Sequence, residues 1–155
     1  MASVELWHRI TDRWRKDEVP IRHGVVSQEI DAFQAKYGVF LFAPVRDYFM
    51  FVDGTGDQME GGLYRFWPLS EVRPVDEVLD DTEHFSYPDR FAYPDCFVFA
   101  DHCIECWDYA VKLTSNPLQP APVFRVTASD PPGEMMAPSF HDFMSSYVDD
   151  PDSII

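Results

Sequence analysis

The final third of the sequence contains the pattern that most restricts the fold, which is three strand-like segments followed by a capped helix. Residues 97–100 form a short apolar run. Residues 107–113 alternate apolar and polar side chains, the period of a half-buried strand, and residues 123–127 show a similar alternation. Ser139, with an acidic side chain three residues later, predicts the start of a helix. This order of elements is more specific than any single motif in the chain.

The first half of the chain has the apolar spacing of three helices. Apolar side chains recur at helical intervals over 3–15, which indicates an amphipathic helix. Ser27 is a suitable cap for a second helix that stops before Gly38. Pro44 suits the first turn of a third helix, which ends by Asp53. We expect these helices to lead into the sheet.

The middle of the chain predicts one strand and a long irregular segment. Residues 63–67 are rich in aromatic side chains and predict a strand that ends before Pro68. Residues 69–72 fit one short helical turn, whereas 73–94 are rich in proline and acidic side chains and predict irregular surface structure. Further on, the C-terminal helix is expected to bury one face, formed by Phe140, Phe143, Met144, Tyr147 and Val148.

Length and composition favour one globular domain over 1–155. A chain of 155 residues can bury about two-thirds of its unfolded surface, and an aromatic content of 15% argues against disorder. No apolar run approaches the roughly 18 residues of a membrane span. Charged side chains interrupt the N-terminus where a secretion signal would be apolar, and three cysteines, an odd number, favour reduced thiols. We therefore expect a cytoplasmic protein.

The net charge of −15 lies in one part of the chain. Residues 1–37 hold six acidic and six basic side chains, whereas 38–155 hold 21 acidic and six basic ones. Such a field repels nucleic acid and anionic membranes, and it attracts a basic protein surface. We therefore expect a basic protein partner and no nucleic-acid or membrane ligand. Solubility alone could also account for the charge.

The acidic side chains are densest over 76–108, where ten of them accompany only Arg90 as a basic residue. The acids expected to steer a partner are Asp76, Glu77, Asp80, Asp81, Glu83, Asp101, Glu105 and Asp108. Trp67 or Trp107 could anchor the complex if exposed. Core packing is the simpler expectation for both tryptophans, because they lie in strand-like segments.

The sequence offers little for catalysis or cofactor binding. It has no glycine-rich phosphate loop and no Gly-x-Ser-x-Gly nucleophile motif, so we expect no cofactor. The one cluster of metal-ligating residue types is Cys96, His102, Cys103 and Cys106. Zinc needs three or four convergent ligands, and a redox pair needs an exposed thiol at a helix N-terminus, whereas Cys103 and Cys106 fall between two predicted strands. We expect no metal, with Cys96 and one of the other two cysteines in the core. A small zinc or thiol enzyme using Cys103 and Cys106 is a remote alternative.

Several phrases of the sequence resemble those of the SUKH superfamily, the Smi/Knr family. Residues 42–54, FAPVRDYFMFVDG, resemble its Leu-Pro-x-x-Tyr-x-x-Phe-Leu-x-x-x-Asn-Gly signature, with Asp53 in place of asparagine and the tyrosine one position displaced. Residues 64–72, YRFWPLSEV, resemble an aromatic strand followed by a Pro-Leu-x-Glu-Val turn. Later phrases follow in the family's order at 97–101 (FVFAD), 109–113 (YAVKL), 122–124 (PVF) and 137–143 (APSFHDF). The resemblance covers about 27–149.

This resemblance implies an α+β fold, in which a mostly antiparallel sheet packs against N-terminal helices and a C-terminal helix. It also implies that the chain has no catalytic residues, because the family works by binding other proteins. Bacterial members commonly neutralise a toxin inside the producing cell, whereas fungal relatives regulate cell-wall assembly. The resemblance therefore implies an immunity-type protein that binds a basic toxin such as a nuclease. A regulatory scaffold that docks on a cellular enzyme is the alternative.

Overall fold

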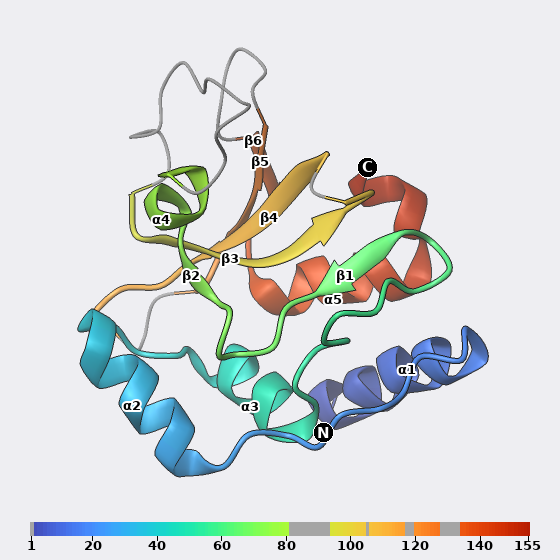
Figure 1. Cartoon of the computed structure of the whole chain (residues 1–155), viewed down its shortest axis with the longest axis horizontal. Helices are drawn as coiled ribbons and strands as arrows, with labels where there is room; N and C mark the ends of the chain where they lie inside the picture. Colours follow the sequence, from blue (N-terminus) through green and yellow to red (C-terminus); the bar gives the residue numbers. More distant parts are fainter. Residues whose placement is uncertain (1, 81–93, 105, 117–119, 128–133) are drawn as a thin grey trace.

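A computed structural model describes residues 2–80, 94–104, 106–116, 120–127 and 134–155 (Figure 1). Within these residues the strands form one antiparallel sheet in the order β1-β3-β4-β5-β6, and β2 pairs with β3 beside β1. The strands are β1 (Tyr64–Phe66), β2 (Arg73–Pro74), β3 (Cys96–His102), β4 (Trp107–Lys112), β5 (Val123–Val126) and β6 (Glu134–Ala137). The expectation of a mostly antiparallel sheet is confirmed.

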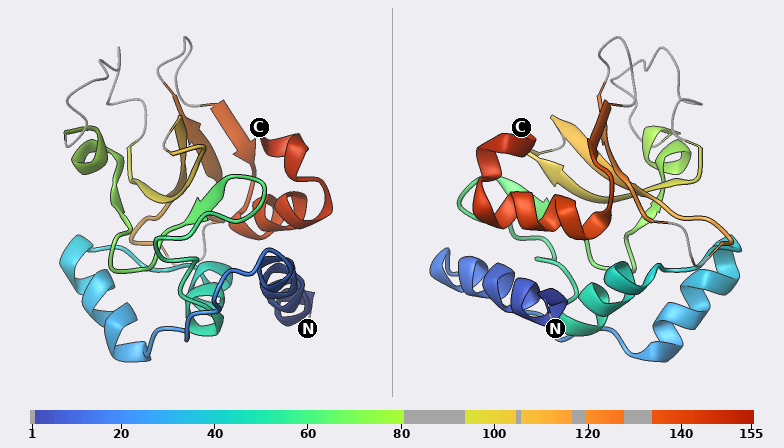
Figure 2. Two further views of the ribbon diagram at one scale, coloured as in Figure 1. Left: turned by 45° about the vertical axis from the view of Figure 1, so that its right-hand side comes forward. Right: turned by 180° about the vertical axis from the view of Figure 1, so that it is seen from behind.

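Helices surround this sheet in the arrangement that the resemblance implied. They are α1 (Ala2–Lys16), α2 (Ser27–Tyr37), α3 (Ala43–Phe51), α4 (Val75–Asp80) and α5 (Phe140–Asp149), followed by a short 3-10 helix, η2 (Pro151–Ile154). Figures 1 and 2 show α5 under one face of the sheet, with α1 and α3 beyond it and α2 to one side. None of the helices in the described part of the chain combines the length and apolar character needed to cross a lipid bilayer.

Aromatic side chains join the helices to the sheet in one core. Phe99 of β3 lies 5.3 Å and 5.6 Å, between ring centroids, from Phe140 and Phe143 of α5. Trp7 of α1 packs edge-on against Tyr48 of α3 at 5.5 Å. Such offset and edge-to-face contacts add to the free energy gained by burying the rings. The α+β expectation is therefore confirmed, with N-terminal helices and a C-terminal helix on the sheet.

The start of α5 follows the sequence closely. The Asp142 backbone N–H donates to the Ser139 side chain at 3.1 Å, which satisfies a donor that the helix end would otherwise leave unpaired. Four of the five side chains expected on its inner face are buried, and Val148 is half-buried. The cap and the apolar face together fix where α5 begins and how it lies on the sheet.

The start of α2 differs from the expectation. Ser27 is the first residue of the helix and not its cap, and the position before it is Val26. The Val26 backbone N–H donates to Glu29 Oε2 at 2.9 Å, so the glutamate of the first turn satisfies this donor instead. Ser27 therefore correctly indicated the start of α2, but the N-cap position lies one residue earlier, at Val26.

The expectation of irregular structure over 73–94 was wrong at its beginning. Residues 73–80 form β2 and α4, because Val75, Val78 and Leu79 bury one side of this short helix. Residues 81–93 lie outside the described residues. The sequence also did not predict β6 or η2. In β5 the expected alternation would place Phe124 and Val126 on the same face of the sheet. Val123 and Val126 are the buried residues instead, and the pairing of β5 with β6 shows a register shift between Val123 and Phe124.

Candidate functional site

The eight acidic side chains expected at a partner interface lie in different environments. Asp76 and Glu77 begin α4 and are exposed. Asp101 and Asp108 lie opposite each other on β3 and β4 and are buried, with 2% and 4% of their surface exposed. Asp80 ends α4, and Asp81, Glu83 and Glu105 lie outside the described residues. Burial therefore removes Asp101 and Asp108 from the surface that a partner can reach.

Asp101 stabilises the sheet from inside the molecule. Its Oδ2 accepts hydrogen bonds from Arg65 Nε at 3.2 Å and from Trp67 Nε1 at 2.7 Å. Arg65 also donates to Glu71 Oε2 at 2.9 Å, and its guanidinium carbon lies 5.1 Å from the Trp67 ring centroid. A buried carboxylate is tolerated only when it is paired in this way. The expectation that Asp101 steers a partner is corrected: it links β1 to β3.

The two tryptophans considered as anchors are both tied to the fold. Trp67 is 3% exposed, so the expectation of core packing is confirmed for it. Trp107 is half-buried, and its ring stacks on His102 with the centroids 4.7 Å apart. Its Nε1 donates to the Tyr109 hydroxyl at 2.8 Å. Trp67 therefore cannot anchor a partner, and only part of Trp107 faces solvent.

The cysteine-rich segment is divided between core and surface. Cys96 is buried, and burial raises the pKa of its thiol to about 12, which keeps it protonated and unreactive. Cys103 is half-buried in the connection between β3 and β4, and Cys106 is exposed. The Cys106 thiol donates to the Cys103 carbonyl oxygen at 2.9 Å, and hydrogen bonding to Cys103 raises its pKa. The expectation for Cys96 is confirmed, but neither Cys103 nor Cys106 belongs to the core.

The same segment is not arranged as a metal site. His102 Nε2 lies 3.1 Å from the Gly62 carbonyl oxygen. The His102 ring stacks on Trp107 at a centroid distance of 4.7 Å and meets the Tyr64 ring at 4.6 Å and an angle of 60°. Within the described ranges, no group of three or more His, Cys, Asp or Glu side chains could hold a metal ion. These contacts give His102 a packing role.

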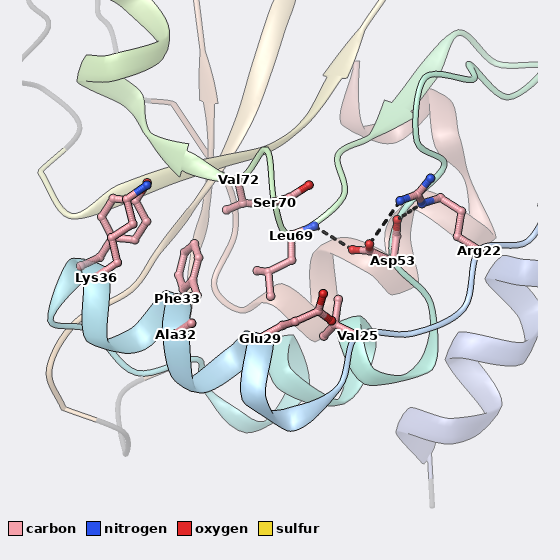
Figure 3. A pocket seen from close by; sticks show the side chains of 11 residues that line it. Arg22, Val25, Glu29, Ala32, Phe33, Lys36, Asp53, Leu69, Ser70 and Val72 are labelled. Atoms are coloured by element: carbon pink, nitrogen blue, oxygen red, sulfur yellow. Dashed lines mark hydrogen bonds and ion pairs between the residues drawn. The ribbon is translucent and has the colours of Figure 1, made fainter.

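A hollow lies between α2 and residues 68–72, and we name it the α2 groove (Figure 3). Its main part has a volume of about 420 Å³. A second hollow of about 240 Å³ shares the lining residue Tyr37 with it and is otherwise lined by residues near α4 and the start of β3. The groove therefore brings together segments that are far apart in the sequence.

Asp53 holds the wall of the groove opposite α2. Its Oδ1 accepts a hydrogen bond from the Leu69 backbone N–H at 2.7 Å, and Arg22 Nε donates to the Asp53 carbonyl oxygen at 3.1 Å (Figure 3). Gly54 follows with φ +66°, and a Cβ there would lie 2.4 Å from the Phe66 carbonyl oxygen. Only glycine fits so close an approach in this conformation. The Asp-Gly pair thus joins the end of α3 to the turn at 68–72.

The floor of the groove is aromatic and its rim is charged. Phe33 and Tyr37 of α2 contact Phe97 of β3, with ring centroids 5.7 Å and 5.2 Å away. Lys36 Nζ lies 5.2 Å from the centroid of the Tyr37 ring. Charged residues along the two hollows comprise four acids and two bases: Glu29, Asp53, Asp76, Asp95, Arg22 and Lys36. The rim is therefore net acidic, like the chain as a whole.

These side chains offer the chemistry of binding. Aromatic faces, exposed carboxylates and an apolar floor can hold a partner by stacking, ion pairing and apolar burial. Among the described residues that line the groove there is no histidine, and the hydroxyl groups are those of Ser70 and Tyr37. No nucleophile is accordingly paired with an imidazole base along this groove.

Sequence reasoning missed the α2 groove although parts of it were visible. Two of the family-like phrases, 42–54 and 64–72, meet at the Asp53–Leu69 hydrogen bond. Their relation could have been suspected from the Asp-Gly pair and the turn that follows the first strand. Asp95 was counted in the acidic stretch but was not singled out, because nothing local distinguishes it from its neighbours.

An α+β fold with this order of elements, and a groove with an acidic rim, are consistent with a small binding domain. The chain belongs to the SMI1 / KNR4 family (SUKH-1), whose family model matches residues 24–146. The resemblance seen in the sequence over about 27–149 is thereby confirmed. No curated protein matches the chain with significance. The matched range includes both walls of the α2 groove, and Arg22 is the one described lining residue that precedes this range.

Proposed function

We propose that this protein is a non-catalytic binding domain that recognises a basic protein, and that this partner is a toxin that it neutralises in the cytoplasm of the producing cell. The observation that carries this proposal is the α2 groove, whose rim is net acidic and both of whose walls lie within the family-matched region. Family membership favours binding over catalysis, and the chemistry of the groove is that of a protein contact.

Electrostatic attraction supplies the first step of recognition. The chain carries a net charge of −15, and Asp76 and Glu77 are exposed on α4 next to the groove. A basic protein is drawn toward such a surface, which raises its association rate at low ionic strength. Asp80, Asp81, Glu83 and Glu105 belong to the same proposal by their sequence positions.

Neutralisation then follows from binding alone. A nuclease needs basic side chains around its active site to bind phosphates, so its active-site face is complementary to an acidic protein. A binding domain that covers this face excludes the nucleic acid without performing any reaction. The groove, with its apolar floor and charged rim, has the composition of the centre of such an interface.

Co-expression tests this proposal directly. Each protein encoded beside this gene is expressed with and without the present protein, and growth is scored together with co-elution of the two chains. The expected result is one neighbour that stops growth alone, permits growth in the pair, and elutes with this protein as a 1:1 complex. Failure of every neighbour to show both effects would count against a toxin partner.

A salt series tests the electrostatic part. The affinity of the cognate pair should fall as ionic strength rises, because exposed charges are screened over about 8–10 Å at 0.10–0.15 M salt. Equal affinity at low and high salt would remove the steering role of the acidic surface while leaving the complex itself in place.

A regulatory scaffold is the second candidate, favoured because the matching family is the SMI1 / KNR4 family. In this case the groove docks on a cellular enzyme, with the same need for a basic contact surface. A housekeeping enzyme that binds the purified protein, in an organism with no toxin gene beside this one, would distinguish the scaffold from the immunity protein.

A further inference from the structure

The hollow at the α4 end of the α2 groove combines aromatic rings with exposed carboxylates. Its lining includes Tyr37 at the end of α2, Phe97 of β3, and Val75 at the start of α4. Asp76 and Asp95 also line this hollow, and both are exposed. The described residues that line it include no basic side chain.

The Tyr37 ring lies where a cation can reach it. It is half-buried and meets the buried Phe97 ring at a centroid distance of 5.2 Å and an angle of 75°. Lys36, which lines the larger hollow, already places its Nζ 5.2 Å from the Tyr37 centroid. A positive group within about 6 Å of an aromatic ring is attracted by the ring's quadrupole. The hollow therefore has the electrostatic character of a cation receptor.

The backbone around Asp95 is fixed by the sheet. Its φ of 59° is left-handed, a conformation that aspartate tolerates better than most residues. Its carbonyl oxygen accepts a hydrogen bond from the Leu113 backbone N–H at 2.9 Å. The Asp95 carboxylate is therefore carried by an ordered position, and the Asp76 carboxylate of the same hollow is carried by the first turn of α4.

We propose that this hollow binds one arginine side chain of the protein partner. A planar guanidinium can stack on an aromatic ring and at the same time donate to carboxylates, whereas the compact, strongly hydrated ammonium of lysine lacks the flat face. The negative charge of the lining selects a cation, and the apolar floor accepts the methylene chain of the arginine. The inference rests on the proposed function, which makes the occupant part of a basic protein.

Titration with an arginine mimic tests this site without the partner. N-acetyl-arginine N-methylamide is added to the isotope-labelled protein, and backbone amide signals are followed by NMR. The expected result is a saturable shift at Tyr37, Asp76 and Asp95 at millimolar concentrations. The matched control ligand is the citrulline derivative, which has the same shape but no charge and should produce no saturable shift. Absence of saturation with arginine, or equal shifts with citrulline, would overturn the proposal.

Variants of the two carboxylates locate the binding. Asp76→Asn and Asp95→Asn should each weaken binding of the arginine mimic about two- to fivefold, the range expected for exposed ion pairs, and the double variant should weaken it further. Glu77→Gln is the matched control, because Glu77 is exposed beside Asp76 on α4 but does not line the hollow. An equal loss in Glu77→Gln would refute the site, since it would show a general charge effect. Unchanged amide signals in α1 confirm that each variant is folded.

The two proposals fail in distinguishable ways. If a neighbouring toxin is neutralised but the arginine mimic does not bind, only the arginine site is wrong. If the mimic binds but no neighbour is toxic, the arginine site stands and the toxin proposal fails. In the first successful complex, an arginine-to-citrulline or arginine-to-alanine change in the partner should weaken binding to this protein and have no further effect on the Asp76→Asn/Asp95→Asn variant.

Discussion

Asp53 accepts the backbone N–H of Leu69 at 2.7 Å, and this single bond joins the end of α3 to the turn that forms one wall of the α2 groove. Leu69 is 4% exposed, so its N–H has little access to water if the acceptor is removed. The same carboxylate pairs with Arg22 across a distance of 3.4 Å. One acidic side chain therefore holds this wall of the groove.

Replacing Asp53 should separate these two contributions. Asp53→Ala leaves a buried donor unpaired and should lower the free energy of unfolding by about 1–3 kcal/mol. Asp53→Asn keeps an acceptor oxygen and loses only the partly exposed ion pair with Arg22, so about 1 kcal/mol or less is expected. Urea denaturation measures both, with Asp57→Ala as an exposed control. Equal losses in the alanine and asparagine variants would show that charge, and not the hydrogen bond, holds the turn.

Glu60 is the buried acceptor that joins α1 to α5. Its carboxylate accepts from Arg13 Nε at 3.1 Å and from the Tyr147 hydroxyl at 2.8 Å, and the Tyr147 oxygen in turn accepts from Trp14 Nε1 at 3.0 Å. Glu60→Ala should therefore cost about 3 kcal/mol and Tyr147→Phe about 1–2 kcal/mol. Because the two share one network, the double variant should lose less than the sum of the single losses. Additive losses in chemical denaturation would disprove the coupling.

Alkaline pH should destabilise the fold through its buried tyrosines. Burial is the main cause that raises the pKa of Tyr48, Tyr64 and Tyr147 above the ordinary value near 10. Above that value the unfolded chain releases phenol protons that the folded chain retains, so the free energy of unfolding falls by about 1.4 kcal/mol per pH unit for each such tyrosine. Circular dichroism between neutral and alkaline pH should show this loss. The Tyr64→Phe variant should reduce its slope, and an unchanged slope would contradict the assignment.

Regular periodicity allowed much of the fold to be predicted. Trp7, Ile10 and Trp14 recur at helical spacing and are all buried, whereas the alternation expected over 107–113 is not seen, because the four central residues of β4 are all buried. The helix α4 escaped prediction because its apolar residues, Val75, Val78 and Leu79, span little more than one turn. A helix of six residues is too short for periodicity to separate it from an irregular segment.

The candidate site was harder to predict than the fold, for a reason that Asp101 illustrates. All seven residues of β3 are buried, so the polar end of this strand is covered like its apolar part. An acidic residue in an acidic stretch is expected at the surface. Arg65 and Trp67, which are more than 30 residues away in the sequence, pair with Asp101 inside the molecule. Such long-range pairing leaves no local signal, whereas the family resemblance already placed the two phrases that build the groove.

The three cysteines should differ in reactivity. Cys106 is exposed, Cys103 is half-buried, and Cys96 is buried with its thiol pKa raised to about 12. A maleimide should therefore modify Cys106 first, because its thiol is exposed. Cys96 should react only after unfolding, because burial covers its thiol and disfavours the reactive thiolate. Mass spectrometry of the native and urea-unfolded protein, with a Cys106→Ser variant as control, measures the order. Modification of Cys96 in the native state at the rate of Cys106 would contradict the burial of this side chain.

Gly54 lies close to the backbone of the turn at the groove, and Gly38 is a matched position without such a contact. Comparing the stability of alanine variants at the two positions measures the cost of this close contact. Gly38 and Gly54 both have φ +66°, so alanine is strained equally at either site. A Cβ on Gly38 would meet nothing within 4 Å, whereas one on Gly54 would lie 2.4 Å from the Phe66 carbonyl oxygen and 2.7 Å from that of Trp67. Gly38→Ala should therefore cost about 1 kcal/mol, the backbone penalty alone.

Gly54→Ala should cost clearly more, about 2–4 kcal/mol, because the backbone of the turn must also move away. The difference between the two variants is the contribution of the Gly54 approach, and it should be accompanied by shifted NMR signals at Leu69 and Ser70, which line the groove. If Gly54→Ala were no less stable than Gly38→Ala, the turn could retreat without loss. The wall of the α2 groove would then be adjustable, and a partner could reshape it on binding.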